Sequence, residues 1–337
     1  MKQRTLTIGL VILFVALAVS AQFGLVDRYI QSVIMLMGVN IILSASLNII
    51  NGYMGEFSCG HAAFMCVGAY VSSILSVLLF ADNPFLGAPL LPAYLSVVLF
   101  PVVALIGGGV AAVSGLLVAI PSFKTRGDYL AIITIAANYI VISAVENLEV
   151  IGGPRGFMGM KQVVRAMDSV AKLPWMVIWV ALGAWFSVFL IRRFVSSTYG
   201  KGAVAINQDE VAAEIMSINT NKIKVAAFML SSGLAGVAGA LFAHQYGYVN
   251  AQSFNILKST ECMVMVYLGG MGSLSGSVLS AVLFTLLLEV LRPLQIIKWV
   301  IVPLILILLM QFRPEGIMGN RELPDFFPWM RKFYRFK

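Results

Sequence analysis

The sequence predicts an all-α polytopic membrane protein with about ten transmembrane helices. Of its 337 residues, 60% are hydrophobic and only 11% are charged, whereas about a quarter of the residues of a soluble domain are charged. Apolar runs of about 20 residues recur along the chain, and each is long enough to cross a hydrocarbon core of about 30 Å. Lipid offers no hydrogen-bonding partner to the backbone, so we expect each run to be a helix.

Ten apolar runs are expected to span the membrane, at residues 6–25, 30–50, 60–80, 93–120, 129–147, 174–191, 225–244, 258–271, 274–291 and 294–312. The eighth run is short and carries Lys258 and Glu261. The first run follows a basic start and has the pattern of a secretory signal, but we expect it to remain as a span because further spans follow.

The basic residues orient these spans. With the N-terminus in the cytoplasm, fifteen Lys and Arg residues fall on inside segments and eight on outside segments, as the positive-inside rule requires. Residues 1–320 then form the transmembrane domain, with a cytoplasmic loop at 192–224 and an outside loop at 148–173. Residues 321–337 form a cytoplasmic tail whose basic and aromatic residues suit a membrane interface. The net charge of +8 is spread singly or in pairs, which argues against a nucleic-acid partner.

The stretch "AINQDEVAAEIMSINTNKIK" (205–224) is a polar segment in the cytoplasmic loop. A helix from Gln208 to Ile218 would place one narrow apolar stripe on one face, made of Val211, Ile215 and Ile218. Along its flank lie the polar residues Glu210, Glu214 and Ser217.

The ends of this expected helix also carry signals. Asp209 and Glu210 fall in the first turn, where acids favour the helix dipole, and Asn219 and Thr220 are suited to cap the next helix. A linker resting on lipid usually has Lys and Arg on its polar face. Acids beside an apolar ridge instead favour docking in a groove of a cytosolic partner.

Two glycine motifs share one spacing. "GYMGEFS" places Gly52, Gly55 and Ser58 at G-x-x-G-x-x-S, and "GGMGSLS" repeats it at the positions Gly269, Gly272 and Ser275. Six expected spans separate the copies, so both face the same way, which suggests a parallel internal repeat.

Glycines at this spacing allow either close helix packing or a break in a helix. A broken helix beside a water-filled path offers free amides and carbonyls to a zwitterion. A candidate solute path therefore comprises Gly52, Gly55, Ser58, Gly60, His61, Gly269, Gly272 and Ser275. Close packing is the alternative for the glycines, and a hydrogen-bonded packing role is the alternative for His61.

Charged residues are scarce within the spans. Lys258 with Glu261, and Glu289 with Arg292, have the spacing of ion pairs on a helix surface. No carboxylate or histidine relay of an ion-driven transporter is evident, and the sequence has no G-x-x-x-x-G-K-[ST] phosphate loop. The three cysteines lack metal-ligand spacing. We therefore expect no cofactor or metal on this chain and an energy source in a partner.

Six stretches carry a resemblance, in the expected order: 47–71, 125–141, 152–157, 199–243, 267–283 and 312–319. Together they resemble the branched-chain amino acid permeases (LivM-like) of bacterial ABC importers. The resemblance implies a non-enzymatic permease domain at 1–320, in the bacterial inner membrane. It also implies a second homologous permease, two cytosolic ATPases that use ATP and a periplasmic binding protein.

In this family the segment 207–218 would be the coupling helix, contacting an ATPase through Asn207, Asp209, Glu210, Val211, Glu214, Ile215 and Ile218. "GDYLAIITIAANYIV" (127–141) favours amino acids as cargo, while urea and short-amide permeases share most of these motifs. Two other classes remain as alternatives. An ion-driven secondary transporter or channel is disfavoured by the lack of charge in mid-membrane. An intramembrane enzyme would have only a Ser58–His61 pair.

Overall fold

The computed structural model describes residues 27–82, 87–123, 129–170, 173–312, 315–319 and 321–322. Within them the predicted all-α class is confirmed, with one two-residue β pairing added. The first expected span (6–25) and all but two residues of the expected tail (321–337) lie outside the described residues.

Six described helices are long and apolar enough to cross a membrane. They correspond to the second to seventh expected spans. They are α2 (Arg28–Asn48, continued by a π-helical turn at Ile49–Tyr53), α3 (His61–Phe80), α4 (Ser96–Ser122), α5 (Tyr129–Glu146), α7 (Trp175–Ser196) and α10 (Thr220–Tyr246).

Three further helices stand where the last three spans were expected: α11 (Ile256–Gly269), α12 (Leu274–Val290) and α13 (Lys298–Phe312). Their lengths are 14, 17 and 15 residues. At 1.5 Å per residue, α11 is about 21 Å long, which is shorter than the hydrocarbon core. The positions of these helices are therefore confirmed, whereas the count of ten spans stays a prediction.

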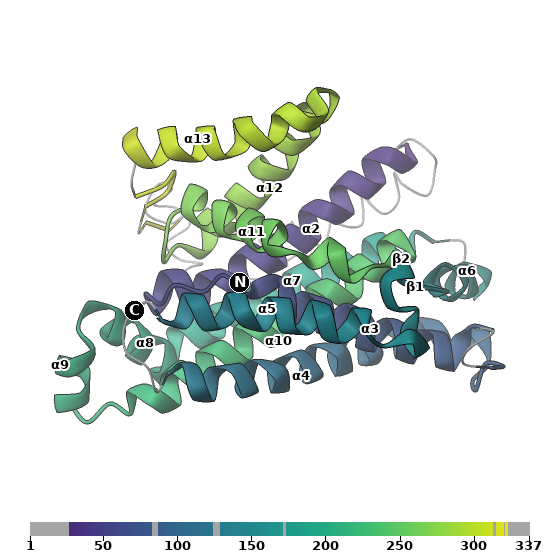
Figure 1. The fold of residues 1–337 in the computed structure, drawn as a ribbon, viewed down its shortest axis with the longest axis horizontal. Helices are drawn as coiled ribbons and strands as arrows, with labels where there is room; N and C mark the ends of the chain where they lie inside the picture. The colour runs from purple at the N-terminus through teal and green to yellow at the C-terminus, as the bar shows by residue number, and fades with distance from the viewer. Residues whose placement is uncertain are drawn as a thin grey trace, which may run out of the picture.

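The helix α10 forms the centre of the bundle and packs on α2, α3 and α4 (Figure 1). Glycine residues form its closest contacts with these helices. A Cβ added to Gly68 would lie 2.2 Å from the Gly236 carbonyl oxygen, and one added to Gly239 would lie 2.0 Å from the Met65 carbonyl oxygen. Small residues at these crossings let the backbones meet, as in other membrane bundles.

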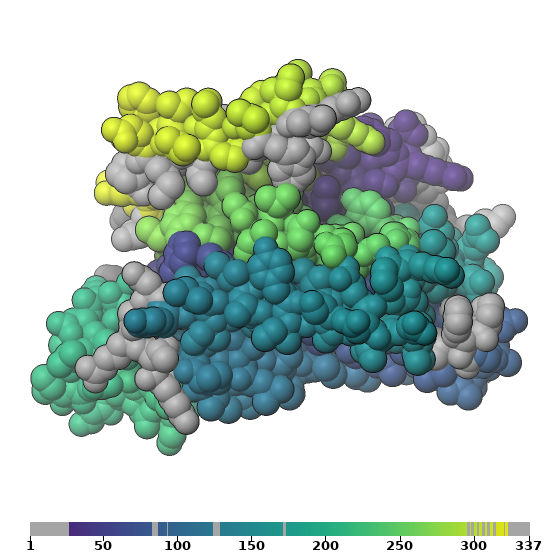
Figure 2. Space-filling view, viewed as in Figure 1, coloured from purple at the N-terminus to yellow at the C-terminus, as the bar shows by residue number. Residues whose placement is uncertain are grey.

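The two long loops lie at opposite ends of the bundle (Figure 1), as their assignment to opposite faces requires. At one end, α6 (Met160–Val170) follows two 3₁₀ turns (Glu149–Ile151 and Gly153–Arg155) and the strand β1 (Phe157–Met158), which pairs antiparallel with β2 (Tyr248–Val249). At the other end lie α8 (Thr198–Gln208) and α9 (Glu210–Ile215), which protrude in the space-filling view (Figure 2). Three short 3₁₀ segments complete the described chain, at Ala93–Leu95, Ala251–Phe254 and Arg292–Ile297.

Candidate functional site

The protruding end contains the tip segment, which we define as residues 207–218. The expectation of one helix from Gln208 to Ile218 is wrong. The helix α8 ends at Gln208, Asp209 takes an extended conformation, and α9 begins at Glu210. The Asp209 carboxylate accepts a hydrogen bond from the Ala212 amide at 3.0 Å, so this residue caps a new helix instead of continuing the old one.

The helix α9 is short because its C-terminal end is also fixed. It ends at Ile215, and Ser217 adopts the left-handed conformation with φ 63°. Asn219 then caps α10 by accepting from the Lys222 amide at 3.0 Å, which confirms the expected cap. The Thr220 hydroxyl donates to the Glu214 carboxylate at 3.0 Å. The tip segment is therefore a defined corner between two capped helices.

The tip segment exposes apolar side chains, but not the expected stripe. Val211 and Ile215 are 62% and 77% exposed, while Ile218 is half-buried and packs against the core. The expectation for Ile218 is wrong because α9 stops before it and Ser217 turns the chain back toward the bundle. Met216, which is 76% exposed, is the third apolar residue of the tip.

Beneath the tip lies a buried lysine that the sequence analysis did not single out. The Nζ of Lys224 is 2.6 Å from Glu56 Oε1 and 2.8 Å from Glu210 Oε1. Its side chain is 8% exposed, and Nζ lies 5.8 Å from the centre of the Phe123 ring. The topology places Glu56, Glu210 and Lys224 on the same membrane face, but no local spacing connects them.

Asn207 brings the tip segment against the first glycine motif. Its Nδ2 donates to the Gly52 carbonyl oxygen at 3.1 Å. Gly55 has φ 74°, and a Cβ there would lie 2.1 Å from Asn207 Oδ1. Two groups that were predicted separately, the coupling residues and the path residues, are thus in direct contact.

The two glycine motifs also contact each other. Gly52 lies in the π-helical turn, and a Cβ there would lie 2.4 Å from the Gly272 nitrogen. The Asn48 side chain spans the junction: Oδ1 accepts from the Gly272 amide at 3.0 Å, and Nδ2 donates to the Ser273 carbonyl at 2.9 Å and to the Ser277 hydroxyl at 2.8 Å. The chain leaves α11 at Gly269 and re-enters a helix at Leu274. Close packing and broken helices are both present, whereas a solute path stays a prediction, as does the internal repeat.

The remaining path residues are buried and tightly packed. A Cβ on Gly60 would lie 2.3 Å from the Thr134 carbonyl oxygen. His61 begins α3, and its Nε2 lies 2.8 Å from the Ser46 hydroxyl. Among the described residues, His61 Nδ1 and the Ser58 hydroxyl have no hydrogen-bond partner. His61 pairs with Ser46 and not with Ser58, which removes the one pair that an intramembrane enzyme would have used.

The second glycine motif is capped by Glu322, at the start of the expected tail. This carboxylate accepts from the amides of Leu274 at 2.8 Å and Ser275 at 3.1 Å. It also accepts from the Ser275 hydroxyl and from the Tyr53 hydroxyl, the latter at 3.3 Å. A carboxylate suits a helix N-terminus because free amides and the helix dipole favour negative charge. Sequence reasoning missed this cap.

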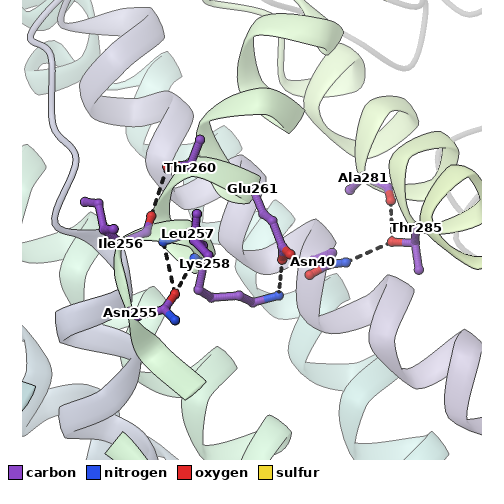
Figure 3. A network of polar contacts seen from close by, with 9 residues as sticks. All are labelled: Asn40, Asn255, Ile256, Leu257, Lys258, Thr260, Glu261, Ala281 and Thr285. Carbon is purple, nitrogen blue, oxygen red and sulfur yellow. Dashed lines mark hydrogen bonds and ion pairs between the residues drawn. The ribbon is translucent and has the colours of Figure 1, made fainter. Parts of the chain in front are cut away.

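Figure 3 shows a polar network around the start of α11. Asn255 caps α11 by accepting from the amides of Leu257 and Lys258, at 3.0 and 3.3 Å. Lys258 Nζ lies 2.8 Å from Glu261 Oε2, and Asn40 Nδ2 donates to the Thr285 hydroxyl at 2.9 Å, connecting α2 to α12. The expected Lys258–Glu261 ion pair is confirmed, and so is the pair of Arg292 with Glu289, at 3.1 Å.

Comparison with known proteins identifies the family. The family model described as "Branched-chain amino acid transport system / permease component" matches residues 29–311. The chain belongs to this family. Its members are permease components of transport systems, so this multi-pass membrane protein is a permease and not an enzyme.

Individual relatives agree with the family. The high-affinity branched-chain amino acid permease LivM of Escherichia coli K12 is 28% identical over 346 residues, covering 94% of this chain and 75% of the relative. The probable LivM of Methanocaldococcus jannaschii is 24% identical, and the match covers 90% of this chain and 96% of the relative. The permease LivH of Escherichia coli K12 is 26% identical over a shorter region, which covers 44% of this chain and 48% of the relative. No solved structure matches the chain.

Proposed function

We propose that this chain is a membrane-spanning subunit of an ATP-driven importer that moves branched-chain amino acids inward across the bacterial cytoplasmic membrane. Its partners would be a second homologous permease, two cytosolic ATP-hydrolysing subunits and a periplasmic binding protein. Both chain ends would lie in the cytoplasm. The family match over residues 29–311 carries this proposal.

The relatives support the cargo and the second permease. LivM and LivH are both named as permease proteins of high-affinity branched-chain amino acid systems, and both match this chain. Two related permeases in one kind of system are consistent with a pair of subunits around a shared path. The names of these relatives favour amino acids over urea or short amides as the cargo.

The tip segment supports a docking role on an ATPase. Val211, Ile215 and Met216 are exposed. They lie on or next to α9, which also carries Glu214 and belongs to the protruding end of the bundle (Figure 2). A soluble partner that covered these side chains would gain roughly 1.5–3 kcal/mol for each one fully buried. Among the family-implied coupling residues, Val211 and Ile215 would then contact the partner. Asn207 and Glu210 would instead connect the tip to the membrane helices, because their side chains bond Gly52 and Lys224.

Uptake measurements test this proposal. Cells that carry or lack the gene would be given labelled leucine, with labelled urea in parallel, and ATP depletion would be compared with collapse of the ion gradients by an ionophore. Gene-dependent leucine uptake that stops on ATP depletion and survives the ionophore is the expected result. Urea uptake would change the cargo, and uptake that follows the ion gradient would contradict the ATP-driven mechanism.

A further inference from the structure

Lys224 differs from the other lysine at the start of α10. Lys222, two residues earlier, is exposed, whereas the Lys224 side chain is 8% exposed and contacts two acids. Lysine is almost never buried to this extent unless it is paired. The two acids come from different parts of the chain, since Glu56 follows the π-helical turn and Glu210 is the first residue of α9. One ammonium group therefore connects the tip segment to the first glycine motif.

The charges at this site resist separation of the two parts. Separating Lys224 from both acids would leave an uncompensated charge in a medium of low dielectric constant, which is costly. Lys224 belongs to α10, which its glycine contacts hold against α3 and α4. When the tip moves, one of two things must therefore happen. Either Glu56 moves with it through Lys224, or the Lys224–Glu210 ion pair breaks.

The two ion pairs differ in burial. The Glu210 side chain is 46% exposed and the Glu56 side chain is 22% exposed. Water can solvate Glu210 when it leaves Lys224, so this contact breaks more readily than the Lys224–Glu56 contact. Two carboxylates share one ammonium group, so release of Glu210 leaves a neutral, still paired Lys224–Glu56 contact.

A second connection runs beside the first. The Asn207 amide donates to the Gly52 carbonyl, and the left-handed Gly55 packs on the same side chain. Gly52 in turn lies against Gly272. A displacement of the tip would thus reach the backbone of both broken helices, because each contact in this series is direct.

From these contacts we propose that Lys224, Glu56 and Glu210, together with the Asn207–Gly52 hydrogen bond, form the link that transmits movement of the tip segment to the two glycine motifs. These are positioning residues, acting between a partner ATPase and the membrane path. The inference rests on the proposed function, because it requires an ATPase to move the tip.

The test uses the complete transporter, purified with its partner subunits and reconstituted in liposomes, with leucine uptake and ATP hydrolysis measured on the same sample. For Lys224→Met we expect an assembled complex that still hydrolyses ATP but takes up leucine at least about tenfold more slowly, a loss that corresponds to about 1.4 kcal/mol of coupling. Lys224→Arg keeps the charge and should retain most of the uptake. The matched control is Lys222→Met, an exposed lysine on the same turn, for which we expect wild-type coupling.

Two further variants keep the proposal testable if Lys224→Met does not assemble. The double variant Glu56→Gln/Lys224→Met leaves no unpaired buried charge, because Glu210 can be solvated, and Asn207→Ala removes only the amide contact. Wild-type uptake per ATP hydrolysed in either assembled variant would overturn the proposed link. Failure of the proposed function would look different, since the wild-type complex itself would then show no ATP-dependent leucine uptake.

Discussion

Gly52 lies directly against Gly272 of the second glycine motif, and Gly52→Ala is a sharp test of that packing. The new Cβ would lie 1.8 Å from Asn48 Oδ1 and 2.4 Å from the Gly272 nitrogen. Neither neighbour can yield easily, because Asn48 is held by three hydrogen bonds and the other atom belongs to the backbone.

The size of the effect follows from what the methyl group displaces. Overpacking a tight site costs about 1–3 kcal/mol, and each hydrogen bond lost from Asn48 adds about 1 kcal/mol. With two of the three Asn48 hydrogen bonds lost, we expect Gly52→Ala to destabilise the protein by about 3–5 kcal/mol, within the range that marks a core defect.

The measurement is the thermal or denaturant unfolding of the purified protein in detergent, with Gly109→Ala as the matched control. Gly109 lies in α4, and a Cβ added there would meet no atom within 4 Å, so alanine at this position should be neutral or stabilising by up to about 1 kcal/mol. If Gly52→Ala proved as stable as Gly109→Ala, the close approach of the two glycine motifs would be refuted.

Three further predictions concern stability, each measured by unfolding of the purified chain. Glu322→Ala should cost about 1–2 kcal/mol because it removes the carboxylate cap of α12, whereas Glu315→Ala, at an exposed residue, should be nearly neutral. Lys258→Met should cost about 3–5 kcal/mol by stranding its partly buried acid, whereas Arg292→Met, 63% exposed, should cost at most about 1 kcal/mol. Asp209→Ala should cost about 1 kcal/mol by removing the cap of α9, and Asp209→Asn should restore it.

Each of these predictions has an outcome that would contradict it. Equal effects of Glu322→Ala and Glu315→Ala would mean that the carboxylate cap contributes nothing. Equal effects at Lys258 and Arg292 would remove the distinction between a partly buried and an exposed ion pair. An Asp209→Asn variant as unstable as Asp209→Ala would show that the side chain does not act as a helix cap.

Features set by local pattern could be predicted from the sequence. Apolar runs gave the positions of the long helices, and i,i+3 spacing gave the Lys258–Glu261 contact. The cap at Asn219 was likewise readable, because amide side chains favour that position. In the ion pair and in the cap, the interacting groups lie within three residues of each other, so the local helix geometry alone brings them together.

Features that depend on distant segments could not be predicted in the same way. Glu56, Glu210 and Lys224 come from three separate segments that meet only in the folded bundle, and no spacing rule encodes their contact. The prediction of one helix from Gln208 to Ile218 was wrong for a related reason. Asp209 is suited both to the first turn of a helix and to a cap, and the sequence does not decide between the two. The cap was formed, and the left-handed Ser217 then turned Ile218 inward.

Ile215→Asp is the decisive variant for the proposal that the tip segment passes movement driven by ATP hydrolysis to the membrane helices. Ile215 is 77% exposed, so the substitution should change stability by no more than about 0.5 kcal/mol. Burying an aspartate where an isoleucine docks would forfeit about 1.5–3 kcal/mol of contact, a loss of affinity of about tenfold or more. The measurement is ATP-dependent leucine uptake in membrane vesicles, with Ile215→Leu as the control that keeps the apolar surface. We predict loss of uptake for Ile215→Asp alone, with normal amounts of the chain in the membrane. Equal uptake by both variants would contradict the assignment of this segment to coupling.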